Sequence, residues 1–247
     1  MAEYESEAAE AALDEFVAEG IVTEILHVIK RGKEAGAYLC RVHEARVGAS
    51  LAVAKVYHER ERRNFANDGV YHEGRVILNG QVRRAVAART SLGLQAQAAM
   101  WVDHEFEVLS DLHYAGADVP EPLFANERAI LMEFVCDGGD PAPQLHRAHI
   151  DRETAAGVVE RLLWNVELFL SYNVVHADLS PFNVLYANGR PVVIDFPQAV
   201  DPRFNRHARA LLERDIANIA RFAARHGIHL DAARHAEQLW QRWQRGG

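Results

Sequence analysis

Short apolar runs rich in β-branched residues occupy much of the chain between positions 21 and 135. They lie at residues 21–29, 37–42, 51–57, 123–124 and 129–135. Gly32, Gly36 and Gly48 separate the first three runs, and turn residues between runs of this kind are typical of neighbouring strands. The pattern predicts an antiparallel sheet in the first half of the chain.

Helical periodicity dominates the rest of the sequence. Apolar residues recur at helical spacing in segments 5–19, 91–114, 151–172, 202–226 and 230–245. In the segment 91–114, Phe106, Leu109 and Leu112 repeat along one side. The second half of the chain is therefore predicted to be mainly helical.

A stretch with the composition of a hinge divides the two patterns. Residues 137–143 read Asp-Gly-Gly-Asp-Pro-Ala-Pro, which is typical of a boundary between compact units. We predict an α+β, two-lobed fold with an N-terminal accessory helix at 1–20, a sheet lobe at 21–135 and a helical lobe at 136–247. Within the sheet lobe, residues 58–90 carry many arginines and few apolar residues, which indicates a mobile basic loop.

Composition removes several classes of function from consideration. The formal net charge of −8 does not favour binding to nucleic acid, a ribosomal particle or an anionic membrane. Cys40 and Cys136 belong to no CxxC or Cys/His group, so we expect two core cysteines rather than a disulfide or a zinc site. The N-terminus is acidic and no apolar run approaches the roughly 20 residues that a bilayer requires. A cytoplasmic protein without membrane contact is the expectation.

The most informative chemistry lies on a predicted hairpin. Residues 184–187 and 191–194 read as two strands around Asn188-Gly189, a strong signal for a two-residue hairpin turn. Counting back from the turn pairs Asn183 with Ile194 and places Asp195 at the same open end. Cross-strand neighbours lie about 5 Å apart, so the two oxygen-bearing side chains can meet on one hard cation such as Mg²⁺.

Asp178 precedes Asn183 by five residues and follows His176, so the preceding loop carries a second carboxylate to the same end of the hairpin. Asp and Asn also cap turns in proteins of every kind, and any one of the three residues alone indicates only a turn. A carboxylate, an amide and a second carboxylate at this spacing together predict a phosphoryl-transfer site, with Asp178 orienting the nucleophile and Asn183 and Asp195 binding the metal.

The sheet half contains residues suited to a nucleotide. Lys55 lies in an apolar strand and needs an anionic partner if it faces inward, and Glu105 on the following helix is the candidate ion-pair partner. The turn Gly32, Lys33, Glu34 and Ala35 lets backbone N–H groups approach phosphate, although alone it reads equally well as a plain turn. Main-chain atoms of Met132, Glu133 and Val135 are the candidate contacts for an adenine ring.

As a set, these residues resemble a protein-kinase fold and, more narrowly, the RIO family of atypical serine/threonine kinases, above all its Rio1 branch. The matching features are Gly-Lys-Glu-Ala at 32–35, Ala-Lys at 54–55, Trp101 to Phe106, Pro-Glu-Pro at 120–122, Met-Glu-Phe at 132–134, Pro-Ala-Pro at 141–143, His-Ala-Asp-Leu-Ser at 176–180, Asn183, Ile-Asp at 194–195 and Gln198. The sequence departs from the family at Lys30-Arg31 and Gly36, where the family has Ser-Thr and Asn, and no Ala-Pro-Glu motif follows Asp195.

The resemblance implies binding of ATP and Mg²⁺ between two lobes and phosphorylation of an unidentified protein substrate. It implies that Lys55 contacts the phosphates and pairs with Glu105, that Asp178 acts as catalytic base or positioner, and that Asn183 and Asp195 bind the metal. It further implies autophosphorylation and an ATPase activity in which Asp195 accepts phosphate transiently.

Two other functions remain open from the residues. A small-molecule kinase of the aminoglycoside phosphotransferase type has a similar stretch of His-x-Asp, Asn and Ile-Asp-Phe, which residues 176–196 also fit. A nucleotide-switched binding module without catalysis is the other alternative, although such a module has no need for all four of Lys55, Asp178, Asn183 and Asp195.

Overall fold

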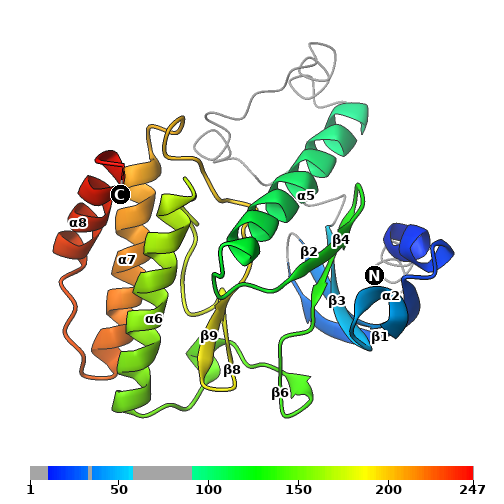
Figure 1. The fold of residues 1–247 in the computed structure, drawn as a ribbon, viewed down its shortest axis with the longest axis horizontal. Helices are drawn as coiled ribbons and strands as arrows, with labels where there is room; N and C mark the ends of the chain where they lie inside the picture. Colours follow the sequence, from blue (N-terminus) through cyan, green and yellow to red (C-terminus); the bar gives the residue numbers. More distant parts are fainter. Residues whose placement is uncertain (1–10, 33–34, 58–90, 247) are drawn as a thin grey trace. The chain divides into compact units, whose positions relative to one another are not determined.

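The computed structural model describes residues 11–32, 35–57 and 91–246, which belong to two compact units (Figure 1). Of these residues, the first unit contains 11–32, 35–57, 91–107 and 121–134, and the second contains 108–120 and 135–246. The division is therefore discontinuous, because residues 108–120 belong with the second unit although they precede the predicted boundary. The predicted basic loop at 58–90 lies outside the described residues.

A five-stranded antiparallel sheet forms the first unit, as the apolar runs predict. Its strands are β1 (Val22–Arg31), β2 (Ala35–Val42), β3 (Leu51–Tyr57), β4 (Pro122–Ala125) and β5 (Ala129–Glu133), in the spatial order β1-β2-β3-β5-β4. A short helix, α2 (Glu44–Val47), connects β2 to β3 and ends at Gly48, whose φ of 80° suits glycine. Alternate residues of β3 are buried, so Lys55 lies on the less buried face of the sheet.

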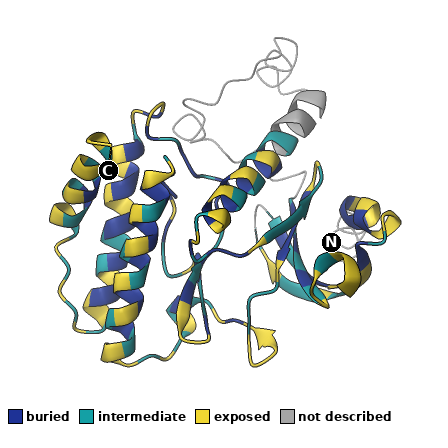
Figure 2. Cartoon of the chain, in the orientation of Figure 1, coloured by how far each residue is buried: buried dark blue, intermediate teal, exposed yellow. Residues whose placement is uncertain are grey.

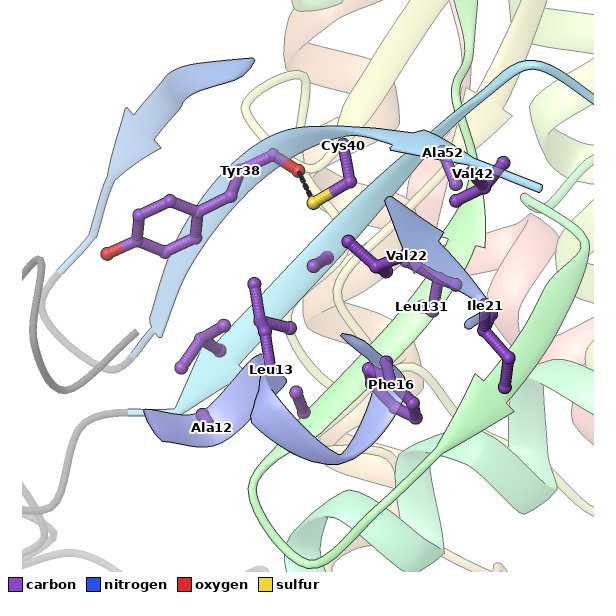
Figure 3. Packing of buried hydrophobic residues seen from close by; sticks show 13 residues of the cluster. Ala12, Leu13, Phe16, Ile21, Val22, Tyr38, Cys40, Val42, Ala52 and Leu131 are labelled. Atoms are coloured by element: carbon purple, nitrogen blue, oxygen red, sulfur yellow. Dashed lines mark hydrogen bonds between the residues drawn. The ribbon is translucent and has the colours of Figure 1, made fainter. Parts of the chain in front are cut away.

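The core of this unit lies between the sheet and an N-terminal helical segment at residues 11–18 (Figure 3). Leu13 and Phe16 of that segment pack with Ile21, Cys40 and Leu131, all of which are buried. Burial raises the pKa of the Cys40 thiol to about 12, so this cysteine is an inert core residue, as predicted. The prediction is wrong for Cys136, which is only half buried.

Helix α5 (Ser91–Tyr114) has the predicted bounds. Its apolar side includes the buried Trp101, Leu109 and Leu112, and Glu105 is also buried. A carboxylate inside an apolar environment needs a cation or a hydrogen-bond donor as its partner. Glu105 is therefore expected to belong to a polar site on this helix.

Three helices dominate the second unit: α6 (Arg152–Ser171), α7 (Ala208–Arg225) and α8 (Ala232–Gln244), which pack against one another (Figures 1 and 2). Asp151 caps α6 by accepting a hydrogen bond from the Thr154 N–H group at 2.8 Å. Helix α7 starts later than the predicted position 202. Asp201 and Asn205 explain why the helix does not begin at 202. Their side chains accept hydrogen bonds from the main-chain N–H groups of Arg203 and His207, which hold this stretch in turns.

The hairpin between Asn183 and Asp195 has the predicted register. Strands β8 (Val184–Ala187) and β9 (Arg190–Val193) pair Ala187 with Arg190 and Val184 with Val193 around a turn at Asn188 and Gly189. Both turn residues have positive φ, as a hairpin of this type requires. Beside it lie a two-stranded ribbon, β6 (Cys136–Asp137) and β7 (Asp140–Pro141), and the 3₁₀ turn η2 (Leu145–Arg147).

None of the helices among the described residues combines the length and the apolar character that crossing a membrane requires.

Candidate active site

Lys55 and Glu105 form a buried ion pair in the first unit. The Lys55 Nζ atom lies 2.7 Å from Oε1 and 2.8 Å from Oε2 of Glu105. The Tyr57 hydroxyl donates to the same carboxylate, and the Lys55 ammonium lies over the Tyr57 ring, 5.2 Å from its centroid. The Glu105 side chain is 1% exposed and that of Lys55 is 16% exposed. The sequence prediction that these two residues pair is confirmed.

The predicted phosphate turn is described only at its two ends. Lys33 and Glu34 lie outside the described residues. The Gly32 N–H group donates to the Ala35 carbonyl at 3.0 Å, and a Cβ at position 32 would lie 2.7 Å from that oxygen. Glycine is therefore required here for a close backbone approach, and its N–H group is already satisfied within the turn.

The predicted adenine contacts Met132, Glu133 and Val135 lie at and just beyond the end of β5. Met132 is buried. The Glu133 N–H group donates to the Glu121 carbonyl at 2.8 Å, and the Val135 carbonyl accepts from the Ala142 N–H group at 3.1 Å. A base bound at this segment must therefore use the other main-chain atoms of these residues.

In the second unit, Asn183 holds Asp178. Its side-chain nitrogen donates to the Asp178 main-chain carbonyl and to the Asp178 carboxylate, each at 3.0 Å. Because both amide hydrogens are directed at Asp178, the Asn183 Oδ1 atom is the side-chain atom left to bind a cation at the predicted metal site. The side chain thus joins the predicted base to the predicted metal site.

Asp195 follows directly after the last pair of the hairpin. The Ile194 N–H group donates to the Asn183 carbonyl at 3.0 Å, which continues the pairing that the sequence predicts. Asp195 has a φ of 76° and Ala177, just before Asp178, has a φ of 67°. Left-handed conformations are costly for residues other than glycine and cluster at functional sites, where the surrounding structure enforces them.

The electrostatics of Asp178 are set by this neighbourhood. Partial desolvation raises the pKa of the Asp178 carboxyl, and the nearby charge of Asp195 adds to that effect. The hydrogen bond from Asn183 and the charge of Arg214 act in the opposite direction without cancelling it. A raised pKa makes the carboxylate a better proton acceptor than a free aspartate.

His176 supports the loop rather than facing substrate. The Asp178 N–H group donates to its Nδ1 atom at 3.3 Å, so the proton lies on Nε2, which donates to the Ile194 carbonyl at 3.2 Å. The His176 ring packs on Phe196 with a centroid distance of 4.5 Å, and Phe196 packs edge-on against Phe169 of α6. The histidine therefore connects the loop, the hairpin and the helical core.

Helix α7 supplies three residues that sequence reasoning missed. The buried Asp215 carboxylate accepts from the N–H groups of Ala177 at 2.8 Å and Leu179 at 2.9 Å. Asn218 donates to the Leu179 carbonyl at 2.7 Å, and Arg214 donates to the Ala177 carbonyl. The main chain on both sides of Asp178 is thus clamped by one helix. The signal was present, because Asp215 falls on the apolar stripe of α7, where an acid needs a partner.

Replacing Asp215 by Asn is expected to reduce stability and to change its dependence on pH. An amide can accept from only one of the two N–H groups through its oxygen and turns an NH₂ group toward the other, which costs about 1–3 kcal/mol. Burial raises the Asp215 pKa to about 7, above its value in the unfolded chain. In the wild type, the unfolded state therefore loses its proton first, and stability falls as pH rises from about 4 to 7.

Urea unfolding across that pH range measures both effects. Asp215→Asn should be less stable than the wild type at pH 5, and the difference in the free energy of unfolding between the two proteins should decrease toward pH 7. Asp137→Asn is the control, since Asp137 is exposed, and it should leave the wild-type profile unchanged. A gap that widens with pH would contradict the raised pKa.

Comparison with known proteins places this geometry in a family. The family described as "RIO domain" matches residues 41–237. A RIO-type serine/threonine-protein kinase Rio1 from Haloferax volcanii is 30% identical over 228 residues, which cover 90% of this chain and 70% of that protein. A RIO-type serine/threonine-protein kinase Rio2 from Methanocaldococcus jannaschii is 29% identical, over 88% of this chain and 74% of that protein.

Eukaryotic relatives match a smaller share of their own length. The human serine/threonine-protein kinase RIO1 is 27% identical over 215 residues, which are 85% of this chain but 35% of the human protein. The chain spans 41% of the corresponding protein from Chaetomium thermophilum. The match therefore concerns the domain that carries the residues described above.

Proposed function

The chain belongs to the RIO domain family, and we propose from this that it is an ATP- and Mg²⁺-dependent phosphotransferase that acts as a serine/threonine protein kinase. The observation that carries the proposal is the Asp178–Asn183 hydrogen bond at the open end of a hairpin that also presents Asp195. Family membership favours this function over the small-molecule phosphotransferase that residues 176–196 also fit.

The residues at the hairpin suit magnesium. The described residues contain no group of three or more His, Cys, Asp or Glu side chains able to hold a metal ion, so a zinc-like cage is not what the hairpin provides. Asn183 Oδ1 and the Asp195 carboxylate are hard oxygen ligands, few in number, and Mg²⁺ commonly takes one or two protein ligands and completes its shell with phosphate and water. When bound, the ion would neutralise charge on the transferring phosphate.

Lys55 has the role of a phosphate ligand in this proposal. Its ammonium is fixed by both oxygens of Glu105, so it does not have to be ordered when ATP binds. Preorganised charge of this kind stabilises a transition state without reorganisation at the moment of reaction. Main-chain groups of Ala35, Met132, Glu133 and Val135 are proposed to complete the nucleotide site, and Gly32 is proposed to shape the turn beside the phosphates.

Asp178 is proposed to orient the acceptor hydroxyl and to take its proton. Its main chain is held from both sides by α7 and one oxygen of its carboxylate accepts a hydrogen bond from Asn183, so the side chain is oriented before a substrate binds. A serine or threonine oxygen then attacks the γ-phosphorus, the bond to ADP breaks, and the hydroxyl proton passes to Asp178.

Asp195 is proposed as a transient phosphate acceptor in the ATPase branch of the reaction. One carboxylate oxygen displaces ADP from the γ-phosphorus, and water then hydrolyses the acyl phosphate to regenerate the carboxylate. Hydroxylamine cleaves an acyl phosphate and leaves a serine phosphate intact, so labelled protein treated with hydroxylamine separates this branch from autophosphorylation.

The proposal is tested with the purified full chain, γ-labelled ATP and Mg²⁺. We expect label on the protein itself and on a generic acceptor such as casein, or slow release of labelled inorganic phosphate. EDTA should abolish both. Absence of transfer to protein and water, together with rapid transfer to an aminoglycoside, would overturn the assignment in favour of the small-molecule alternative.

A further inference from the structure

Phe182 is an exposed aromatic residue in the loop that carries the proposed base. It lies between Asp178 and Asn183 in the chain, and 57% of it is accessible to solvent. Phenylalanine is normally buried, and a large apolar side chain that stays exposed in a well-ordered loop needs an explanation. Its neighbours in sequence, Leu179 and Asn183, are both buried.

The loop holds Phe182 in place without covering it. The Phe182 carbonyl accepts from the Gln144 side chain at 2.5 Å, and the Pro181 carbonyl accepts from the His146 N–H group at 3.1 Å. The Asn183 N–H group donates back to the Ser180 carbonyl at 2.8 Å. One face of the ring packs on His146, with a centroid distance of 4.2 Å and an interplanar angle of 34°. The rest of the ring faces solvent from a fixed backbone.

The histidine beneath the ring carries a second unexplained feature. Its Nδ1 atom is buried and makes no hydrogen bond, and it is the one such side-chain nitrogen or oxygen found among the described residues. The Nε2 atom accepts from Arg147, which places the ring proton on Nδ1. A buried donor without a protein acceptor is rare in folded proteins.

Chain geometry puts Phe182 within reach of a substrate at Asp178. Consecutive Cα atoms are about 3.8 Å apart, and Asn183 spans from its own backbone to the Asp178 carboxylate, so the Phe182 backbone lies within about 10 Å of that carboxylate. An extended peptide advances about 3.3–3.6 Å per residue. A side chain one to three residues from a hydroxyl at Asp178 is therefore close enough in the chain to reach Phe182.

We propose that Phe182, supported by His146, is a specificity-determining contact that selects an apolar side chain one to three residues from the serine or threonine that the protein phosphorylates. Phe182 supplies an apolar surface, and His146 packs beneath the ring and supports it. The inference rests on the proposed function, because it assigns the substrate class of the same site.

A positional-scanning peptide library with a fixed central serine tests the contact. With labelled ATP and the full chain, the wild type should prefer Leu, Ile, Phe or Met at one position within three residues of the serine, by about tenfold over charged residues, as expected for an apolar contact. Phe182→Glu should reverse the preference at that position toward Lys and Arg. Phe182→Leu, which keeps an apolar side chain, should retain it with a raised KM.

Tyr114→Glu is the matched control, because it places the same charge on an aromatic position that is 91% exposed at the end of α5. It should leave the preference as in the wild type. If the wild type phosphorylates the library without an apolar preference, or if Phe182→Glu keeps that preference, the inference is wrong while the kinase assignment stands. If the wild type transfers phosphate neither to peptides nor to water, the proposed function itself fails.

Discussion

Asp178→Asn is expected to lower the rate of phosphoryl transfer by about 10²–10⁴-fold while leaving the fold intact. The amide cannot take the proton of the acceptor hydroxyl, although it still accepts the hydrogen bond from Asn183. The raised pKa of Asp178 means that its ionised form is less favourable in the folded protein than in water. Removing the charge should therefore leave the melting temperature unchanged or raise it.

Single-turnover kinetics with labelled ATP, together with thermal unfolding, separate these two effects. Asp140→Asn is the control, since Asp140 is an exposed aspartate of the same unit, and it should change neither quantity. A variant at position 178 that keeps the wild-type rate would remove Asp178 from the chemistry. A rate loss that accompanies unfolding would instead assign it a structural role.

Lys55→Met is expected to reduce both catalysis and stability. Loss of a preorganised electrostatic contact to the phosphates should lower kcat/KM for ATP by about 10²–10³-fold. The change also leaves the Glu105 carboxylate buried without its cation, and removing one partner of a buried pair costs about 3–5 kcal/mol. Urea unfolding measures the second effect without reference to activity.

The double variant Lys55→Met/Glu105→Gln distinguishes an uncompensated charge from lost packing. It removes both charges of the ion pair, so it should be more stable than Lys55→Met alone, while its activity stays low. The non-additivity measures the coupling between the two side chains. If the double variant loses as much free energy of unfolding as the single variants Lys55→Met and Glu105→Gln lose together, the two side chains are not coupled and the interpretation is wrong.

Arg41→Met provides the matched surface comparison in the same sheet. Arg41 pairs with Glu24 at 3.1 Å, but both side chains are more than half exposed. Exposed pairs of this kind contribute about 0–1 kcal/mol. Comparing the loss of stability in Arg41→Met with that in Lys55→Met therefore tests whether burial of the ion pair, rather than its presence, determines how much free energy of unfolding is lost.

The hairpin register was predictable because local rules determine it. A two-residue turn at Asn188 and Gly189 allows one pairing, and side chains alternate along each strand, so Asn183 and Asp195 had to reach the same end. The Lys55–Glu105 pair was predictable for another reason. Lys55 is a charged group in an apolar strand and needs an anionic partner if it faces inward, and Glu105 lies on the helix that follows.

The hydrogen bonds from α7 to the loop around Asp178 were not predicted, since they join residues more than 35 positions apart in the chain. Asp215 could be recognised as an acid on an apolar helical stripe, but no local pattern says which main-chain N–H groups it binds. The late start of α7 was missed for a related reason, because Asp201 and Asn205 compete for main-chain hydrogen bonds that a helix would otherwise use.

The amino-acid sequence by itself determined the five strands of the sheet, the hairpin, the long helices apart from the start of α7, and the identities of the proposed catalytic groups, because periodicity, turn residues and spacing act over short distances. Only the tertiary structure decided that Asn183 directs its amide hydrogens at Asp178, that the Ala35 carbonyl accepts from the Gly32 N–H group, and that α7 holds the loop around the proposed base. The contacts of α7 depend on which donors and acceptors meet when distant segments pack, and the two local contacts depend on the conformations of a turn and a side chain. A linear pattern specifies neither.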